Sequence, residues 1–255
     1  MSRDRKTAAA ILAAGLGTRM DSELPKALLD LGGRPIIAHV LDAVVAAGIE
    51  DIVVVIGHRG ELVQQAIGNG VRYAVQECQR GTADALMCAR QALEGFQGRL
   101  FALYCDVPFV PADLLRRLAR ECETTRAAAA MVTVELDEPG RYGRIVRDAA
   151  GKVTGIKEAA GATPAELAIK EINAGIYCFE APLIFEIAAE IQPDPVKGEL
   201  YLTDAIGLLA SSGYEVAVVK ADDPAVVMGV NTPAELEDAR ATMGRISGSR
   251  RRADA

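Results

Sequence analysis

Several residue types that often mark a function are scarce in this chain. Its 255 residues include no tryptophan, two histidines and five cysteines, and aromatic residues make up 4% of the total. The cysteines form neither a Cys-x-x-Cys pair nor a Cys/His ligand spacing, which argues against a zinc site and is typical of a protein kept in a reducing cytoplasm. No stretch reaches the roughly 18 uninterrupted apolar residues of a membrane span. The sequence therefore predicts a cytoplasmic protein with no membrane partner.

An excess of basic charge is also absent. The formal net charge is −7, and lysine and arginine are spread along the chain apart from a cluster near its end. Such a distribution predicts no basic surface that could bind nucleic acid. Because the overall charge would repel an anion, a small anionic substrate would have to be bound by a few basic side chains and backbone N–H groups at its site. Half of the residues are hydrophobic, which predicts one large domain, or one domain with a smaller subdomain.

The first residues imitate a signal peptide, because Arg3, Arg5 and Lys6 precede the apolar run 7–14. A glycine-rich loop follows this run at once, and cleavage there would remove the run. We therefore expect no signal peptide.

This loop has the composition of a phosphate-binding segment. The apolar residues 8–13 predict a buried first strand, after which Gly15 and Gly17 let backbone N–H groups approach phosphate oxygens. Arg19 can bind two phosphate oxygens, and Lys26 adds a second positive charge. The segment indicates a nucleotide substrate, although a tight strand-to-helix turn with solvated Arg19 and Lys26 would have the same sequence.

Two better-known glycine loops fit less well. A P-loop ends in Gly-Lys-Ser/Thr, whereas Gly17 is followed by Thr18 and Arg19, so this possibility is excluded. A dinucleotide-binding fingerprint needs a third glycine where Met20 stands and an acidic residue where Gly57 stands, so this possibility is disfavoured.

Strand-like and helix-like segments alternate through the first half of the chain. The predicted strands are 8–13, 52–56, 71–75 and 100–104, and the predicted helices are 35–48, 61–67 and 83–93. This alternation predicts an α/β fold with a parallel sheet covered on both faces. Ligands of such sheets bind outside the carboxyl ends of the strands, so the glycine loop, Gln76 and Asp106 are expected to meet in one crevice.

The second half has a different pattern. Strands are predicted at 129–134 and 225–230, and a hairpin at 144–156 around a turn at 148–151. Two Thr-Pro-Ala-Glu capping boxes, at 163–166 and 232–235, each predict the start of a helix. The segment 246–255 has three arginines and no apolar periodicity, which predicts a frayed tail.

Four polar residues are candidates for a site, and each has a second interpretation. Asp106 ends an apolar strand and is either a ligand of a metal such as magnesium or the cap of the next segment. Gln76 offers a donor and an acceptor that match N3–H and O4 of uracil, but it is also an ordinary polar strand end. By themselves, Asn231 before Thr232 would be a turn residue and Glu158 a charged residue after a hairpin.

A series of motifs runs through residues 7–240: 12–20, 25–26, 76–83, 104–108, 142–145, 171–176, 201–204 and 229–231. In order and spacing this series resembles the sugar-nucleotide pyrophosphorylase family, and within it the uridyltransferase domain of the bacterial N-acetylglucosamine-1-phosphate uridyltransferases. The resemblance implies a Rossmann-like nucleotidyltransferase fold with a mainly parallel central sheet and a smaller sugar-side β-rich lobe.

The resemblance also implies a domain organisation. Residues 1–243 would form the nucleotidyltransferase domain, with a nucleotide-binding part at 7–126 and a mainly sugar-side part at 127–243. Residues 244–255 would be a flexible tail. Bifunctional family members continue into a β-helix acetyltransferase domain of hexapeptide repeats, which this sequence lacks, so no such domain is expected.

Roles for individual residues follow from the same resemblance. The catalytic residues would be Arg19, Lys26 and Asp106, and the Mg²⁺ ligands would be Asp106 and Asn231. Uridine would be bound by Gln76, Gly81 and Thr82, and the sugar by Gly143, Glu158 and Asn173, with Tyr201 and Thr203 close by. The other expected substrate contacts are Leu12, Ala13, Ala14, Gly15, Tyr104 and Cys105.

Two positions depart from the family pattern. Asp84 stands where many relatives carry histidine, and Cys105 stands where the family usually has glycine. The first leaves base recognition intact, whereas the second lies inside a substrate-contacting motif and bears on the sugar that is preferred.

The resulting hypothesis is that the protein forms UDP-N-acetylglucosamine and pyrophosphate from UTP and N-acetylglucosamine 1-phosphate, for the synthesis of cell-envelope precursors. No Ser or Cys is paired with a base, which fits direct displacement. Two alternatives stay open: a related transferase for another sugar 1-phosphate or base, and a non-catalytic sensor of sugar nucleotides. The expected partners are these small molecules, and the sequence leaves the oligomeric state open.

Overall fold

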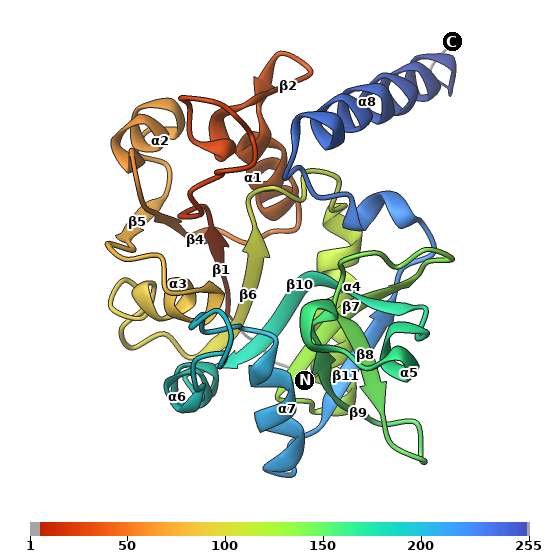
Figure 1. The fold of residues 1–255 in the computed structure, drawn as a ribbon. Coiled ribbons are helices and arrows are strands. Elements are labelled where there is room, and N and C mark those ends of the chain that lie inside the picture. The colour runs from red at the N-terminus through yellow and green to blue at the C-terminus, as the bar shows by residue number, and fades with distance from the viewer. Residues whose placement is uncertain (1–5, 254–255) are drawn as a thin grey trace.

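The computed structural model describes residues 6–253 and has a large mixed sheet at its centre (Figure 1). Residues 1–5 and 254–255, which include Arg3, Arg5 and the last residues of the expected tail, lie outside the described residues. The first half contains β1 (Thr7–Leu12), β2 (Asp30–Leu31), β3 (Arg34–Pro35), α1 (Ile36–Ala46), β4 (Asp51–Ile56), α2 (Gly60–Ile67), β5 (Arg72–Val75), α3 (Thr82–Cys88), β6 (Gly98–Tyr104) and α4 (Ala112–Thr125). The second half contains β7 (Ala129–Glu135), β8 (Arg144–Arg147), β9 (Val153–Lys157), α5 (Pro164–Leu167), β10 (Glu171–Ala181), α6 (Leu183–Glu190), α7 (Asp204–Ser211), β11 (Val216–Lys220) and α8 (Pro233–Ala253). Three 3-10 turns, η1 (Lys26–Leu28), η2 (Ala159–Gly161) and η3 (Pro224–Val227), complete the described elements.

The central sheet has the strand order β11-β7-β10-β6-β1-β4-β5. Strand β1 is parallel to both β4 and β6, and the pairs β4–β5 and β7–β11 are also parallel. Within this order β10 runs opposite to its neighbours, because it pairs antiparallel with β6 and β7. The predicted α/β fold with a mainly parallel sheet is therefore confirmed.

Two apolar cores lie on opposite faces of this sheet. Successive residues of β1 alternate between them, with Ile11 in one core and Leu12 in the other, as the period of a strand requires. Helices α1, α2 and α4 contribute to the first core, and α3, α6 and α7 contribute to the second. Burial on both faces explains why the strands are continuous apolar runs.

A third, smaller core joins the segment after the glycine loop to the start of α8. It contains Met20, Leu29, Leu31 and Ile36 from the first part of the chain and Val230, Leu236 and Ala239 from the last part. In Figure 1, α8 lies beside β2 accordingly. This core connects two segments that are about 200 residues apart in the sequence.

The predicted hairpin is confirmed as β8 and β9, which pair antiparallel around the turn at Asp148. It is attached to the central sheet because Arg144 of β8 pairs with Ile172 of β10. The hairpin is thus an extension of the sheet, and the division of the chain at residue 126 stays a prediction.

Three expectations about secondary structure are wrong. Helix α3 ends at Cys88, after which the N–H groups of Ala89 and Arg90 donate to carbonyls three residues back and form turns. The run 225–230 is the 3-10 turn η3 followed by extended chain, because Pro224 and the capping carboxylate of Asp223 begin a turn there. Helix α8 continues to Ala253, because a helix that has already begun gains a hydrogen bond for each residue added, even in a run without an apolar stripe.

Within residues 6–253, the structure contains no helix with the length and apolar character needed to cross a membrane.

Candidate active site

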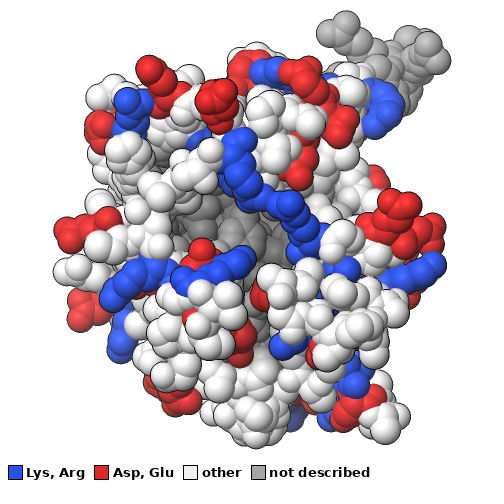
Figure 2. Space-filling view, in the orientation of Figure 1, with Lys and Arg blue, Asp and Glu red and all other residues white. Residues whose placement is uncertain are grey.

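A cavity of about 620 Å³ opens at the carboxyl ends of β1 and β6. Figure 2 shows the hollow at the centre of this face, with basic side chains on its rim, and the basic residues that line it are Arg19, Lys26 and Arg141. Its size is within the range of sites for small molecules. All residues expected to contact substrate line this cavity: Leu12, Ala13, Ala14, Gly15, Arg19, Lys26, Gln76, Gly81, Thr82, Tyr104, Cys105, Asp106, Gly143, Glu158, Asn173 and Asn231. Their individual roles stay predictions.

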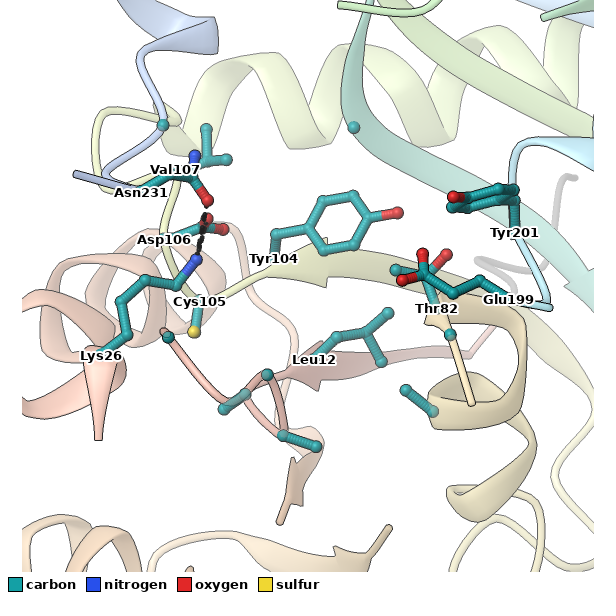
Figure 3. Close-up of a pocket in the computed structure, with 18 of the residues that line it drawn as sticks. Leu12, Lys26, Thr82, Tyr104, Cys105, Asp106, Val107, Glu199, Tyr201 and Asn231 are labelled. Atoms are coloured by element: carbon teal, nitrogen blue, oxygen red, sulfur yellow. Dashed lines mark hydrogen bonds and ion pairs between the residues drawn. The ribbon is translucent and has the colours of Figure 1, made fainter. Parts of the chain in front are cut away.

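One end of the cavity contains a cluster of charged and amide groups (Figure 3). The ammonium of Lys26 donates to Oδ2 of Asp106 at 2.5 Å and to Oδ1 of Asn231 at 3.0 Å. Arg19 also reaches Oδ1 of Asn231, at 3.3 Å. Burial by itself would lower the pKa of Lys26, but the adjacent Asp106 outweighs this effect and raises it. Lys26 is therefore a cation at neutral pH.

The backbone brings Asp106 and Asn231 together. The N–H of Val230 donates to the carbonyl oxygen of Asp106 at 2.9 Å, so the chain before α8 is bonded to the end of β6. The N–H of Asn231 donates to the carboxylate of Glu235 at 2.7 Å, and the N–H of Glu235 donates to Thr232 at 3.2 Å. The predicted capping box is thus present in a shifted form, with Glu235 bonded to Asn231 in place of Thr232.

The glycine loop lies against Lys26. Gly17 has φ of +61°, and a Cβ there would come within 3.3 Å of Cβ of Lys26. Gly15 is exposed and has open space around it, so a ligand can approach its backbone. These are the properties that bind phosphate oxygens to a backbone loop.

Gln76 lies between the glycine loop and α3 and is 3% exposed. Its Nε2 donates to the carbonyl of Gly81 at 3.1 Å and to Oδ2 of Asp84 at 2.8 Å. The expectation that Gln76 offers both a donor and an acceptor to a base is therefore wrong for this arrangement, because both amide hydrogens are already used. The nearby Thr82 accepts a hydrogen bond from the N–H of Leu202 at 2.9 Å.

At the other end of the cavity, the side chains of Glu158 and Asn173 are held by hydrogen bonds to neutral groups. Thr203 donates to Glu158 at 2.9 Å. Burial raises the pKa of Glu158 above its ordinary value, although the hydrogen bond from Thr203 acts in the opposite direction. The side chain of Asn173 donates to the hydroxyl of Tyr177 at 2.6 Å and accepts the N–H of Gly175 at 3.0 Å, so it also shapes β10.

Tyr104 separates the two ends, as Figure 3 shows. Burial raises the pKa of its hydroxyl, which makes it a neutral group that hydrogen bonds with Thr82. Gly175 lies against the ring of Tyr104, and a Cβ on Gly175 would come within 2.7 Å of it.

Cys105 is 4% exposed and lines the cavity beside Asp106. Burial raises the pKa of its thiol to about 12, so the thiol is neutral and unreactive at physiological pH. The residue is therefore not a nucleophile.

Sequence reasoning missed several lining residues, among them Gln79, Arg141, Tyr142 and Glu199. Gln79, Arg141 and Tyr142 stand within three residues of a predicted contact, and Glu199 stands two residues before Tyr201. Tyr142 also donates to the carbonyl of Val227 at 2.8 Å and so bridges the hairpin side to the segment that leads to Asn231.

The oxygen pair of Asp106 and Asn231 suits a hard cation. No group of three or more His, Cys, Asp or Glu side chains in residues 6–253 is arranged to hold a metal ion. Mg²⁺, however, needs only one or two protein oxygens when phosphates and water supply the rest. In this structure the ammonium of Lys26 contacts both oxygens, which shows that the pair accommodates a positive charge.

A mainly parallel α/β sheet with a glycine loop after its first strand, and an oxygen pair bonded to an ammonium beside that loop, is typical of proteins that bind phosphorylated nucleotides. A family model described as a MobA-like NTP transferase domain matches residues 9–170. The chain belongs to this family, whose activity is nucleotidyl transfer.

Individual relatives are similar over nearly the whole chain. The bifunctional protein GlmU of Pelotomaculum thermopropionicum is 44% identical over 231 residues, which cover 91% of this chain and 50% of that protein. The GlmU proteins of Brevibacillus brevis and Solibacter usitatus are each 42% identical, over 93% and 89% of this chain. This chain spans about half the length of these curated relatives. The similarities confirm the predicted relation to the sugar-nucleotide pyrophosphorylases.

Proposed function

We propose that the protein transfers the uridylyl group of UTP to N-acetylglucosamine 1-phosphate and releases pyrophosphate. The observation that supports this most strongly is the position of the Lys26 ammonium, between Asp106 and Asn231 and against the glycine loop. A triphosphate bound by the loop would meet positive charge from Lys26 and Arg19 on one side. The ordered motif series that resembles the uridyltransferases supports the choice of base and sugar.

In the proposed reaction, a phosphate oxygen of the sugar phosphate attacks the α-phosphorus of UTP. The bond from that phosphorus to the bridging oxygen of the β-phosphate breaks, and pyrophosphate leaves with the electron pair. The attacking oxygen is already anionic, so no residue has to remove a proton from it. Catalysis then consists of alignment and charge stabilisation.

The two ends of the cavity would bind different parts of the substrates. Lys26 and Arg19 would bind the phosphates and stabilise the negative charge that develops on pyrophosphate. Asp106 and Asn231 would hold Mg²⁺, which neutralises phosphate charge when it is bound. Glu158 would accept hydrogen bonds from sugar hydroxyl groups and so orient the sugar phosphate.

A second candidate is a sister enzyme for a different sugar 1-phosphate, and Cys105 is the observation that favours it. A thiol fills space in the cavity where the family usually has glycine, so a smaller or differently substituted sugar would fit better.

A pyrophosphate-release assay that crosses four nucleoside triphosphates with several sugar 1-phosphates tests both candidates. We expect turnover with UTP and N-acetylglucosamine 1-phosphate that stops when a chelator removes Mg²⁺. Faster turnover with another sugar would support the sister enzyme. Binding of UDP-sugar with no turnover for any pair would mean that the protein is a sensor and would overturn the proposal.

A further inference from the structure

The orientation of the Gln76 side-chain amide is fixed by its surroundings. Its Nε2 lies 3.1 Å from the carbonyl oxygen of Gly81 and 2.8 Å from a carboxylate oxygen of Asp84, and neither oxygen can donate a hydrogen bond. If the amide were rotated by half a turn, its own oxygen would face these two acceptors. The two contacts therefore determine which atom of the amide is the nitrogen.

Asp84 is itself held in place. Its second carboxylate oxygen accepts from Arg80 at 2.7 Å, and the Asp84 side chain is 9% exposed whereas that of Arg80 is 69% exposed. The pair neutralises the buried carboxylate and directs its other oxygen at Gln76. The main chain of Gln76 is fixed as well, because its N–H donates to Ile56 at 2.8 Å and its carbonyl accepts from Gln79 at 3.1 Å.

With both amide hydrogens used, Oε1 is the atom of the Gln76 amide that stays available to a ligand in the cavity, and it is an acceptor. A base that places an N–H opposite this oxygen forms a hydrogen bond. A base that places a lone pair there is repelled and leaves both groups without a partner. At ring position 3 uracil has an N–H and cytosine has a lone pair.

We propose that Asp84, supported by Arg80, is a positioning residue that selects uracil against cytosine by holding the Gln76 amide in one orientation. This inference rests on the proposed function, because it assumes that the nucleotide base binds beside Gln76.

The test compares the affinities of UTP and CTP, measured by equilibrium titration, and the ratio of kcat/KM for the two nucleotides. Asp84→Ala removes the acceptor. Asp84→Asn keeps the size of the side chain but can present either an oxygen or an amide to Gln76, so both orientations of Gln76 become possible. In both variants we expect the preference for UTP to fall at least about tenfold, because UTP binds less tightly and CTP more tightly.

Arg80→Ala removes the charge that holds Asp84 but leaves its acceptor in place, so the preference should fall by a smaller factor than in Asp84→Ala. A further variant serves as the control. Asp113→Ala removes the acidic residue from the first turn of α4, as Asp84→Ala does in α3, and should leave the preference unchanged. If Asp84→Ala does not fold, the nearly isosteric Asp84→Asn shows by itself whether Asp84 sets the preference for UTP over CTP.

Two outcomes would overturn the inference, and they are distinguishable. If the native protein prefers UTP and Asp84→Asn retains that preference within twofold, Asp84 does not select the base, and the proposed function stands. If the native protein has no preference for UTP over CTP, both the inference and the uridylyl part of the proposed function are wrong.

Discussion

The two ends of the cavity are built in different ways. At the charged end, Asp106 and Asn231, from segments far apart in the sequence, meet around the ammonium of Lys26. At the opposite end, Glu158, Asn173 and their partners are fixed by hydrogen bonds to one another and to nearby backbone. Charge stabilisation acts on the rate of a reaction, whereas directed hydrogen bonds act on binding and selectivity. We therefore expect variants of the first end to lower kcat and variants of the second end to change KM and substrate preference.

The largest effect is expected from the charged end. Lys26→Ala or Asp106→Asn should lower kcat at least about a hundredfold, since groups that stabilise developing charge contribute several kcal/mol. Lys26→Ala should also lower the melting temperature, because it leaves the Asp106 carboxylate, which is 14% exposed, without its cation, so kcat is measured at a temperature at which each variant is folded. Lys152→Ala, which removes an exposed ion pair with Glu215, is the matched control. A rate within tenfold of normal in either variant would mean that the charged end does not carry the chemistry.

At the sugar end, Glu158→Gln should raise KM for the sugar phosphate about tenfold and change kcat less, because one acceptor is lost. Burial raises the pKa of Glu158 above its ordinary 4.5, so the native protein should lose sugar affinity as the pH falls through this raised pKa. The variant should not show this loss. Glu135→Gln, on the surface, is the control, and an identical pH profile in Glu158→Gln would contradict the assignment.

The same pKa shift predicts an effect on stability with a definite sign. The folded protein binds the Glu158 proton more tightly than the unfolded chain does, so the free energy of unfolding should decrease as the pH rises from about 4.5 through the raised pKa. Glu158→Gln removes this loss and should be at least as stable as the native protein at pH 7. Chemical denaturation at several pH values measures the difference, and a marked destabilisation of the variant at pH 7 would show that the carboxylate stabilises the fold.

A smaller effect is expected where the two ends meet. Gly175→Ala places a methyl group against Tyr104 at a φ of +71° and should displace the ring, which raises KM several-fold. Gly213→Ala is a close control, because Gly213 has φ of +82° but open space around its Cβ. Both variants carry the backbone strain, and only the first should change kinetics. Equal kinetics in the two would show that Tyr104 does not position substrate.

The smallest effect is expected from Cys105→Gly, which removes a buried thiol from the cavity wall. The ratio of kcat/KM for N-acetylglucosamine 1-phosphate and glucose 1-phosphate should change by a few fold, since this steric difference is expected at the lower end of what one methylene is worth in a pocket, about 1 kcal/mol. Cys88→Ala, outside this cavity, is the control. An unchanged ratio would mean that Cys105 only packs.

The sequence predicted best what depends on local patterns. Uninterrupted apolar runs identified β1, β4 and β6, and the parallel arrangement that they imply brought the glycine loop, Gln76 and Asp106 to one edge. The run 225–230 was misjudged because a valine-rich segment looks like a strand until a preceding proline and a capping aspartate begin a turn.

The features that the sequence did not predict are contacts between side chains of distant segments. The contact between Lys26 and Asn231 joins positions 205 residues apart, and only a family resemblance pointed to Asn231. The use of both Gln76 amide hydrogens depends on which side-chain conformers Asp84 and Arg80 adopt, which no spacing rule reports. Similarly, no sequence pattern predicted that Glu235 would bond to Asn231 in place of Thr232.

The small third core has a consequence for how this chain can be divided. Met20, Leu29 and Leu31 pack against Leu236 and Ala239, so the segment that carries Lys26 is supported by residues beyond Asn231. A fragment that stops at Asn231 would include every member of the charged end and still lack the packing that holds Lys26 near it. Any fusion, split or circularly permuted version of the protein therefore has to keep the first turns of α8 with the domain, because they pack against the segment that carries Lys26.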